Sequence, residues 1–153
     1  MKYSPSSLQL LGYTRRPENW NDFVSKTMAT WYKFSPDHSV SKFAWVNNPH
    51  HRNSQGVTHG GALMTFMDYC MAAHVWDLSG GKSGYTIELN NQFIRPARIN
   101  RWLFAEVRAT SVGETIELQG TINANDPTGM LILKSFGRFT LPKELKIIDD
   151  DND

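Results

Sequence analysis

A single carboxylate, Asp68, stands inside a long and almost continuously apolar stretch of this 153-residue chain. The stretch runs from Ala62 to Trp76, and Asp68 is flanked in it by Met67 and Tyr69. Burying a carboxylate without a partner costs free energy, and such groups concentrate at functional sites. Asp68 is therefore a candidate general base or nucleophile. The alternative is a structural Asp that a neighbouring hydroxyl or amide satisfies.

The tripeptide His59-Gly60-Gly61 comes directly before this stretch. Glycines let a ligand approach the backbone, and the first amides of a helix have no partner inside the helix. Together with the positive end of the helix dipole, such amides suit an oxygen that gains negative charge. The alternative is that the glycines only form a tight turn and that His59 is a structural hydrogen-bonding residue.

Two further polar residues could assist this chemistry. Asn53 offers an amide that could orient a water or a carbonyl, and Thr86 could hydrogen-bond a carboxylate. Asparagine is common in polar loops, and threonine favours strands without any functional reason. Neither residue points to a site by itself.

The elements that must position these residues follow from the hydrophobic pattern. The stretch from Ala62 to Trp76 is too long for one strand and is apolar nearly all round, which predicts a buried helix. The other apolar segments, separated by turn signals, predict strands. The expected strands lie at about Asp37–Asn47, Tyr85–Phe93, Trp102–Val112, Thr115–Ala124 and Met130–Leu141.

The ends of the chain carry less information. Apolar residues at helical spacing predict a helix from Pro17 to about Ala29 or Tyr32. No internal repeat or linker interrupts the chain, so we expect one domain over residues 1–153. It would carry a variable helical segment at about 1–33 and a disordered acidic tail at about 147–153.

The order of elements predicts an α+β fold in which a curved antiparallel sheet of five to six strands wraps a long central helix. A helix that is apolar on every face needs such a wrapping, because an open two-layer arrangement would leave one side in water. Four of the expected strands follow the helix as a meander.

The segment Asn53–Asp68 resembles the signature of hotdog-fold thioesterases, in the subgroup of the phenylacetate-degradation thioesterases and their mitochondrial relatives. The segment Tyr85–Ala97 is similar to the next segment of that family, including its closing proline. The resemblance covers about residues 37–141. Tyr69-Cys70 and Trp76 make the helix bulkier than in many relatives, which affects the expected shape of the acyl pocket.

This resemblance implies an acyl-CoA thioesterase without a metal or another cofactor. Asp68 would be the general base or nucleophile, and Asn53 would orient the water or the thioester. The Gly60 N–H would polarise the carbonyl, His59 would support that loop, and Thr86 would assist the carboxylate. Gly61 would contact the substrate, and a pocket lined by Met64, Met67, Met71 and nearby aromatic residues could admit a medium-chain or aromatic acyl group. The phosphates of coenzyme A would lie near basic residues, namely Arg95, Arg98, Arg101, Lys82 and Arg52.

The spacing of Gly60 and Asp68 predicts self-association. The two residues are eight positions apart, which is about 12 Å along a helix. One thioester carbon cannot lie within about 3 Å of both groups in one chain. A dimer with two composite sites would solve this, and the resemblance implies a homodimer or a homotetramer.

The composition argues against several other classes of function. The net charge of +1 gives no broad basic surface for nucleic acid or for an anionic membrane. One cysteine and no long apolar span favour a soluble cytoplasmic protein, with no membrane partner. Cys70 and His74 have the i, i+4 spacing of metal ligands, but too few ligands accompany them for a zinc site. The open alternatives are a non-catalytic acyl-CoA binder and an enoyl-CoA hydratase or dehydratase.

Overall fold

The computed structural model describes residues 1–141. The acidic tail predicted at 147–153 lies outside the described residues. The elements in chain order are α1 (Pro5–Leu10), β1 (Thr14–Arg15), η1 (Glu18–Trp20), α2 (Phe23–Thr27), β2 (Thr30–Phe34), β3 (Ser41–Val46), η2 (Pro49–His51), α3 (Gly60–Leu78), β4 (Tyr85–Phe93), β5 (Trp102–Val112), β6 (Thr115–Ala124) and β7 (Met130–Thr140).

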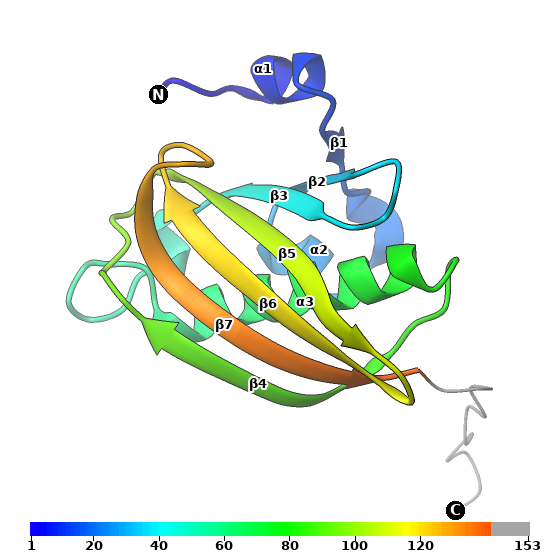
Figure 1. The fold of residues 1–153 in the computed structure, drawn as a ribbon. Helices are drawn as coiled ribbons and strands as arrows, with labels where there is room; N and C mark the ends of the chain where they lie inside the picture. The colour runs from blue at the N-terminus through cyan, green and yellow to red at the C-terminus, as the bar shows by residue number, and fades with distance from the viewer. Residues whose placement is uncertain (142–153) are drawn as a thin grey trace, which may run out of the picture.

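The strands form one sheet in the order β1-β2-β3-β5-β6-β7-β4, and all neighbours are antiparallel. Figure 1 shows the sheet curving around α3. The predicted α+β arrangement of a long helix and a curved antiparallel sheet is confirmed. The sheet has seven strands instead of the expected five to six, because the N-terminal segment adds β1 and β2.

The prediction of one helix from Pro17 to about Tyr32 is wrong. After η1, Asn21 adopts the left-handed conformation with φ 56°, and Asp22 then caps the separate helix α2. The residues from Thr30 to Phe34 pair with β3 instead. Tertiary pairing outweighs helical spacing here, because Thr30 and Trp31 become buried as parts of a strand.

The core lies between α3 and the concave face of the sheet. Phe66, Met67, Met71 and Val75 of α3 are fully buried against residues of β3, β5, β6 and β7. The sheet comes so close to the helix that a Cβ atom on Gly120 would lie 2.5 Å from Sδ of Met67. These contacts fix the position of α3, and with it the position of every residue on the helix.

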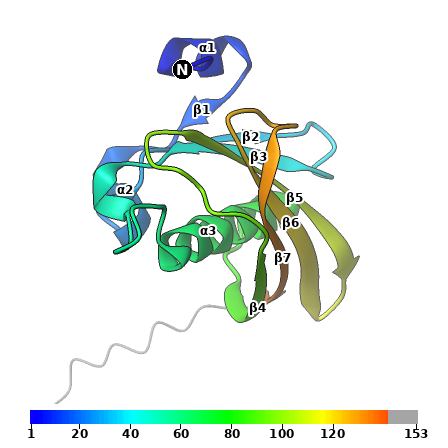
Figure 2. The ribbon, with the colours of Figure 1, turned by 90° about the vertical axis from the view of Figure 1, so that its left-hand side faces the viewer.

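The opposite side of α3 is only partly covered. Figure 2 shows α2 beside α3 on the concave side of the sheet. Met64 and Trp76 are exposed by 39% and 48%, and Asp68 is half-buried. The expected wrapping on every side is therefore incomplete in a single chain. Among residues 1–141, no helix is both long enough and apolar enough to span a membrane.

Candidate active site

Asp68 and Thr86 meet at the uncovered side of α3. The Thr86 hydroxyl donates a hydrogen bond of 2.7 Å to Oδ1 of Asp68. Asp68 lies on α3 and Thr86 lies near the start of β4, so the contact joins the helix to the edge of the sheet. A charge-assisted hydrogen bond of this kind holds the carboxylate in one orientation.

A β-bulge in β4 brings Thr86 to this position. The pairing with β7 shifts between Thr86 and Glu88, so that Thr86 lies opposite Phe139 and Glu88 lies opposite Arg138. Leu89 packs against the core, and in a regular strand residues three apart point to opposite faces. The extra residue at Ile87 lets both Thr86 and Leu89 face the helix.

The His59-Gly60-Gly61 turn forms the N-terminus of α3. Gly60 is the first residue of this 19-residue helix, and His59 is its N-cap. Nδ1 of His59 accepts a hydrogen bond of 2.8 Å from the Gly61 N–H. The Gly60 N–H has no acceptor among residues 1–141. The turn therefore leaves the Gly60 amide available for a ligand, whereas the Gly61 amide is occupied.

Asn53 organises the loop before the helix. Its side-chain oxygen accepts hydrogen bonds from the N–H groups of Gln55 and Val57, at 3.0 and 3.3 Å. The loop is fixed at its far end, where the Thr58 N–H donates to the carbonyl of Ala97 at 2.8 Å. The structure shows no contact between Asn53 and Asp68 within residues 1–141. The predicted site residues thus form two groups, one at Asp68 and Thr86 and the other at the N-terminus of α3.

Two of the predicted basic residues, Arg95 and Arg98, lie near the second group. An antiparallel bridge between Val57 and Arg98 places Arg98 beside the loop that leads into α3. Arg95 follows β4 and donates to the carbonyl of Leu131 at 3.3 Å. Both arginines are exposed. In the part of the chain that the structure describes, neither forms an ion pair with a carboxylate.

Two of the three methionines predicted to line the acyl pocket lie in the core of the single chain. Met67 and Met71 are fully buried under the sheet, where Met67 fits over Gly120 and Met71 over Gly137. Both side chains fill the core of the single chain, and the role of Met71 in substrate binding stays a prediction. Only Met64 is exposed, one helical turn after Gly60.

Cys70 and His74, the two possible metal ligands on α3, are both buried in the core. Cys70 is fully buried, and burial raises the pKa of its thiol well above the ordinary value. His74 is also buried, with Nδ1 at 2.7 Å from the Ser41 hydroxyl. Among residues 1–141, no three His, Cys, Asp or Glu side chains come together as a metal site would require.

Two further features lie on α3 or against it. The ring of Phe93 lies against Gly60, because a Cβ atom on Gly60 would lie 3.3 Å from Cε1 of Phe93. Phe93 is 52% exposed although it is a large apolar side chain. The other feature is a pocket between α3 and the N-terminal segment, described below. In the sequence, this pocket is indicated only by the many aromatic residues of the N-terminal segment.

Comparisons with known proteins agree with this picture. Residues 55–116 match the family model of the thioesterase superfamily, and this region includes Gly60, Asp68 and Thr86. Acyl-coenzyme A thioesterase 13 of Mus musculus is 27% identical over 90 residues, which cover 59% of this chain. The matched part covers 63% of the length of that relative, less than two thirds.

Solved structures show the same fold. The Escherichia coli PaaI protein from the phenylacetic acid degradation operon is similar with a TM-score of 0.70 and 18% identity, over 80% of this chain and 86% of that one. A hypothetical thioesterase of Streptococcus pneumoniae, solved with coenzyme A, has a TM-score of 0.65 and 15% identity, over 85% and 88%. The predicted resemblance to hotdog-fold thioesterases is therefore confirmed, by the fold of these structures and by the superfamily match over residues 55–116.

Proposed function

We propose that this chain is an acyl-CoA thioesterase that hydrolyses a thioester to the free acid and coenzyme A. The observation that carries the proposal is the hydrogen bond between Thr86 and Asp68 at 2.7 Å. It holds one carboxylate in a fixed orientation on the uncovered side of an otherwise apolar helix. Asp68 would activate a water molecule as general base, or attack the carbonyl carbon directly.

The free Gly60 amide supplies the second part of the mechanism. It lies at the positive end of a 19-residue helix, where an N–H donor stabilises an oxygen that becomes negative in the transition state. His59 supports the turn by accepting from the neighbouring Gly61 amide. A thiolate leaves readily, so this route uses no metal and no strong general acid.

The two parts belong to one site only if two copies of the chain combine. Gly60 and Asp68 are eight residues apart on α3, which is about 12 Å along the axis. We therefore propose that Gly60 of one copy faces Asp68 of another in a two-fold dimer. A dimer of dimers would contain the same sites.

Strand β4 supports this assembly. Among residues 1–141 it is an edge strand of nine residues with one side unpaired, and an unpaired edge favours association with another chain. It also carries Tyr85 and Ile87, which are 56% and 50% exposed. Pairing through β4 would cover these side chains and place Asp68 near the partner's helix.

Coenzyme A would bind beside the N-terminus of α3. Arg95 and Arg98 are exposed there, and guanidinium groups suit phosphates. The structural relative from Streptococcus pneumoniae was solved with coenzyme A, which supports the same ligand for this chain. Asn53 would use its side-chain N–H groups toward the water or the thioester, because its oxygen is already bonded within the loop.

Thiol release from a panel of acyl-CoAs tests the proposal. The panel contains short, medium, long and aromatic acyl groups, and the proteins are wild type, Asp68→Asn and Asp68→Ala. We expect wild type to turn over at least one substrate and both variants to lose about 10² or more of the rate. Acyl-CoA binding without thiol release by wild type would instead indicate a non-catalytic binder. A selective addition of water to enoyl-CoA would indicate a hydratase.

A further inference from the structure

A pocket of about 430 Å³ lies between α3 and the N-terminal segment. Pockets that bind small molecules commonly have volumes of about 300–1,000 Å³ and mostly apolar or aromatic walls. Most of this wall is aromatic. The large side chains in it are Arg16, Trp20, Tyr32, Phe34, Tyr69 and Trp76.

The wall is held in a defined shape. Tyr32 and Phe34 are two positions apart on β2, and their ring centroids are 5.1 Å apart. The ring centroids of Phe34 and Trp76 are 6.4 Å apart. The Arg16 guanidinium lies between two rings, 4.6 Å from the centroid of Trp20 and 5.2 Å from that of Tyr69. Stacking on both rings fixes the plane of the guanidinium.

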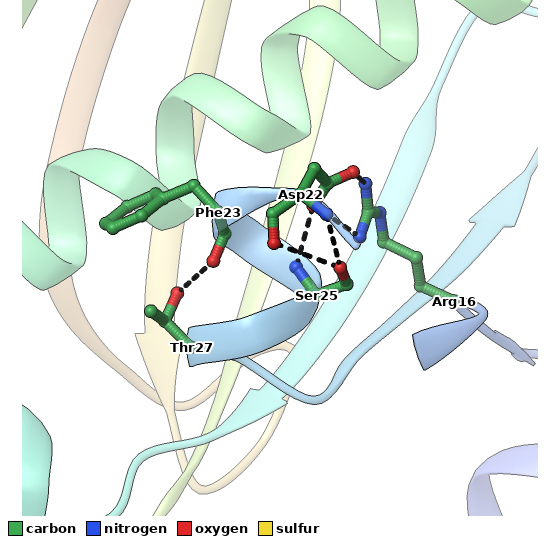
Figure 3. A network of polar contacts seen from close by, with 5 residues as sticks. All are labelled: Arg16, Asp22, Phe23, Ser25 and Thr27. Carbon is green, nitrogen blue, oxygen red and sulfur yellow. Dashed lines mark hydrogen bonds and ion pairs between the residues drawn. The ribbon is translucent and has the colours of Figure 1, made fainter. Parts of the chain in front are cut away.

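Polar contacts at the start of α2 keep Arg16 in this place, as Figure 3 shows. Both terminal nitrogens of Arg16 bond to the carboxylate of Asp22, and Nη1 lies 3.1 Å from Oδ1. The Asp22 carboxylate also accepts from the Ser25 N–H at 2.8 Å, as the N-cap of α2. The short helix α2 thus anchors the N-terminal wall of the pocket.

The surface of α3 links this pocket to Asp68. Ala72 lies one turn after Asp68, so the two residues are neighbours on the same side of the helix. The next residue, Ala73, lines the pocket. The residues on the helix surface between the carboxylate and the aromatic wall along this path, Ala72 and Ala73, therefore have small side chains.

We propose that this pocket receives the acyl group of the substrate and that the N-terminal segment thereby sets acyl specificity. The inference rests on the function proposed above. The thioester would be held at Asp68, and a bulky apolar acyl group, aromatic or aliphatic, would extend over Ala72 into the space beside Trp20 and Trp76. Arg16 and Trp20 lie outside the region matched by the superfamily model.

Two exposed aromatic residues of the N-terminal segment make a matched test. Trp20 and Phe23 are exposed by 59% and 66%, and only Trp20 lines the pocket. Figure 3 shows the Phe23 ring pointing away from Arg16. Neither ring is part of the core, so Trp20→Ala and Phe23→Ala are both expected to fold.

The measurement is the ratio of kcat/KM for bulky acyl-CoAs to that for acetyl-CoA, with phenylacetyl-CoA and octanoyl-CoA as separate bulky substrates. We expect Trp20→Ala to lower this ratio about tenfold for at least one of them and Phe23→Ala to leave it unchanged. Ala73→Leu, which narrows the pocket, should lower it too. The substrate that is more affected identifies the occupant as aromatic or aliphatic.

Unchanged ratios in active Trp20→Ala and Ala73→Leu enzymes would overturn this inference and leave the proposed function intact. A wild-type protein that releases thiol from no member of the panel would overturn the proposed function, and the inference with it. If Phe23→Ala lowered the ratio of kcat/KM values as much as Trp20→Ala does, the inference would also be overturned, because the effect would then not depend on the pocket.

Discussion

Thr86 and Asp68 are joined by a hydrogen bond of 2.7 Å between a hydroxyl on the edge strand β4 and a carboxylate on the central helix. The bond orients Oδ1 toward the strand and leaves Oδ2 for another partner. In the proposed reaction, Oδ2 would then be the atom that contacts the water or the thioester.

Removing the Thr86 hydroxyl should therefore lower catalysis without affecting the fold. Thr86 is exposed, so Thr86→Val keeps the shape of the side chain and deletes one hydrogen bond to a charged group. We expect kcat to fall by about 10- to 100-fold, since such bonds are worth about 1.5–3 kcal/mol. Thr86→Ser keeps the hydroxyl and should keep most of the rate. Equal kcat values for wild type and Thr86→Val would contradict a role in positioning Asp68.

The Gly60 amide can be removed by one substitution. Proline is well tolerated at the first position of a helix, and His59 already has the φ of −60° and ψ of 135° that suit a residue before proline. Gly60→Pro deletes the N–H, whereas Gly60→Ala keeps it and places a similar Cβ against Phe93. We expect kcat for Gly60→Pro to be about 10²-fold or more below that of Gly60→Ala. Similar rates for the two variants would argue against the amide as an oxyanion donor.

Mixing two inactive variants tests whether the site is shared between subunits. A dimer of Gly60→Pro and Asp68→Ala chains contains one site with both groups intact and one site with neither. Random exchange of subunits should restore about a quarter of the wild-type rate, because half of the dimers are mixed and each has one good site of two. If each site belongs to a single chain, the mixture will be as inactive as its components.

Two buried histidines should make stability depend on pH. Burial lowers the pKa of His51 and of His74 below the ordinary value of 6.5. The unfolded chain therefore binds protons more readily than the folded one. The free energy of unfolding should be constant above about pH 6.5 and should decrease as the pH falls below it. Urea unfolding between pH 5 and pH 8 measures this slope.

His51 also forms two hydrogen bonds in the folded protein. Nδ1 accepts from the Asn48 N–H at 2.9 Å, and Nε2 lies 2.7 Å from the carbonyl of Thr27. A second proton on the ring would displace the Asn48 contact. His51→Gln cannot titrate, so it should reduce the slope; an unchanged slope would place the effect at His74 or elsewhere.

Much of the fold could be predicted from the sequence. Strands β4, β5 and β6 have the predicted bounds, because alternating apolar residues are separated by strong turn signals. The helix α3 was predicted from its continuous apolar composition. The N-terminal segment was not predicted correctly, because short elements there depend on pairing with β3 and not on their own periodicity.

The candidate site also has parts that could be predicted from the sequence and parts that could not. Asp68 and the glycine turn were found because a carboxylate inside an apolar helix and a Gly-Gly pair before it are local patterns. Met67 and Met71 are among the residues predicted to line the acyl pocket, because a one-dimensional pattern does not distinguish a core face from a pocket face. Their burial depends on how closely the sheet approaches the helix at Gly120 and Gly137, which is a property of the whole fold.

The bulge in β4 makes the position of Thr86 depend on the number of residues in the strand as well as on their types. Deleting Ile87 would turn Thr86 to the outer face, and the pairing from Glu88 to Phe93 would stay as it is. The core would remain packed, and the carboxylate would lose the hydroxyl that orients it. A change of length by one residue is therefore a route by which such a chain can lose the proposed chemistry and still keep its fold.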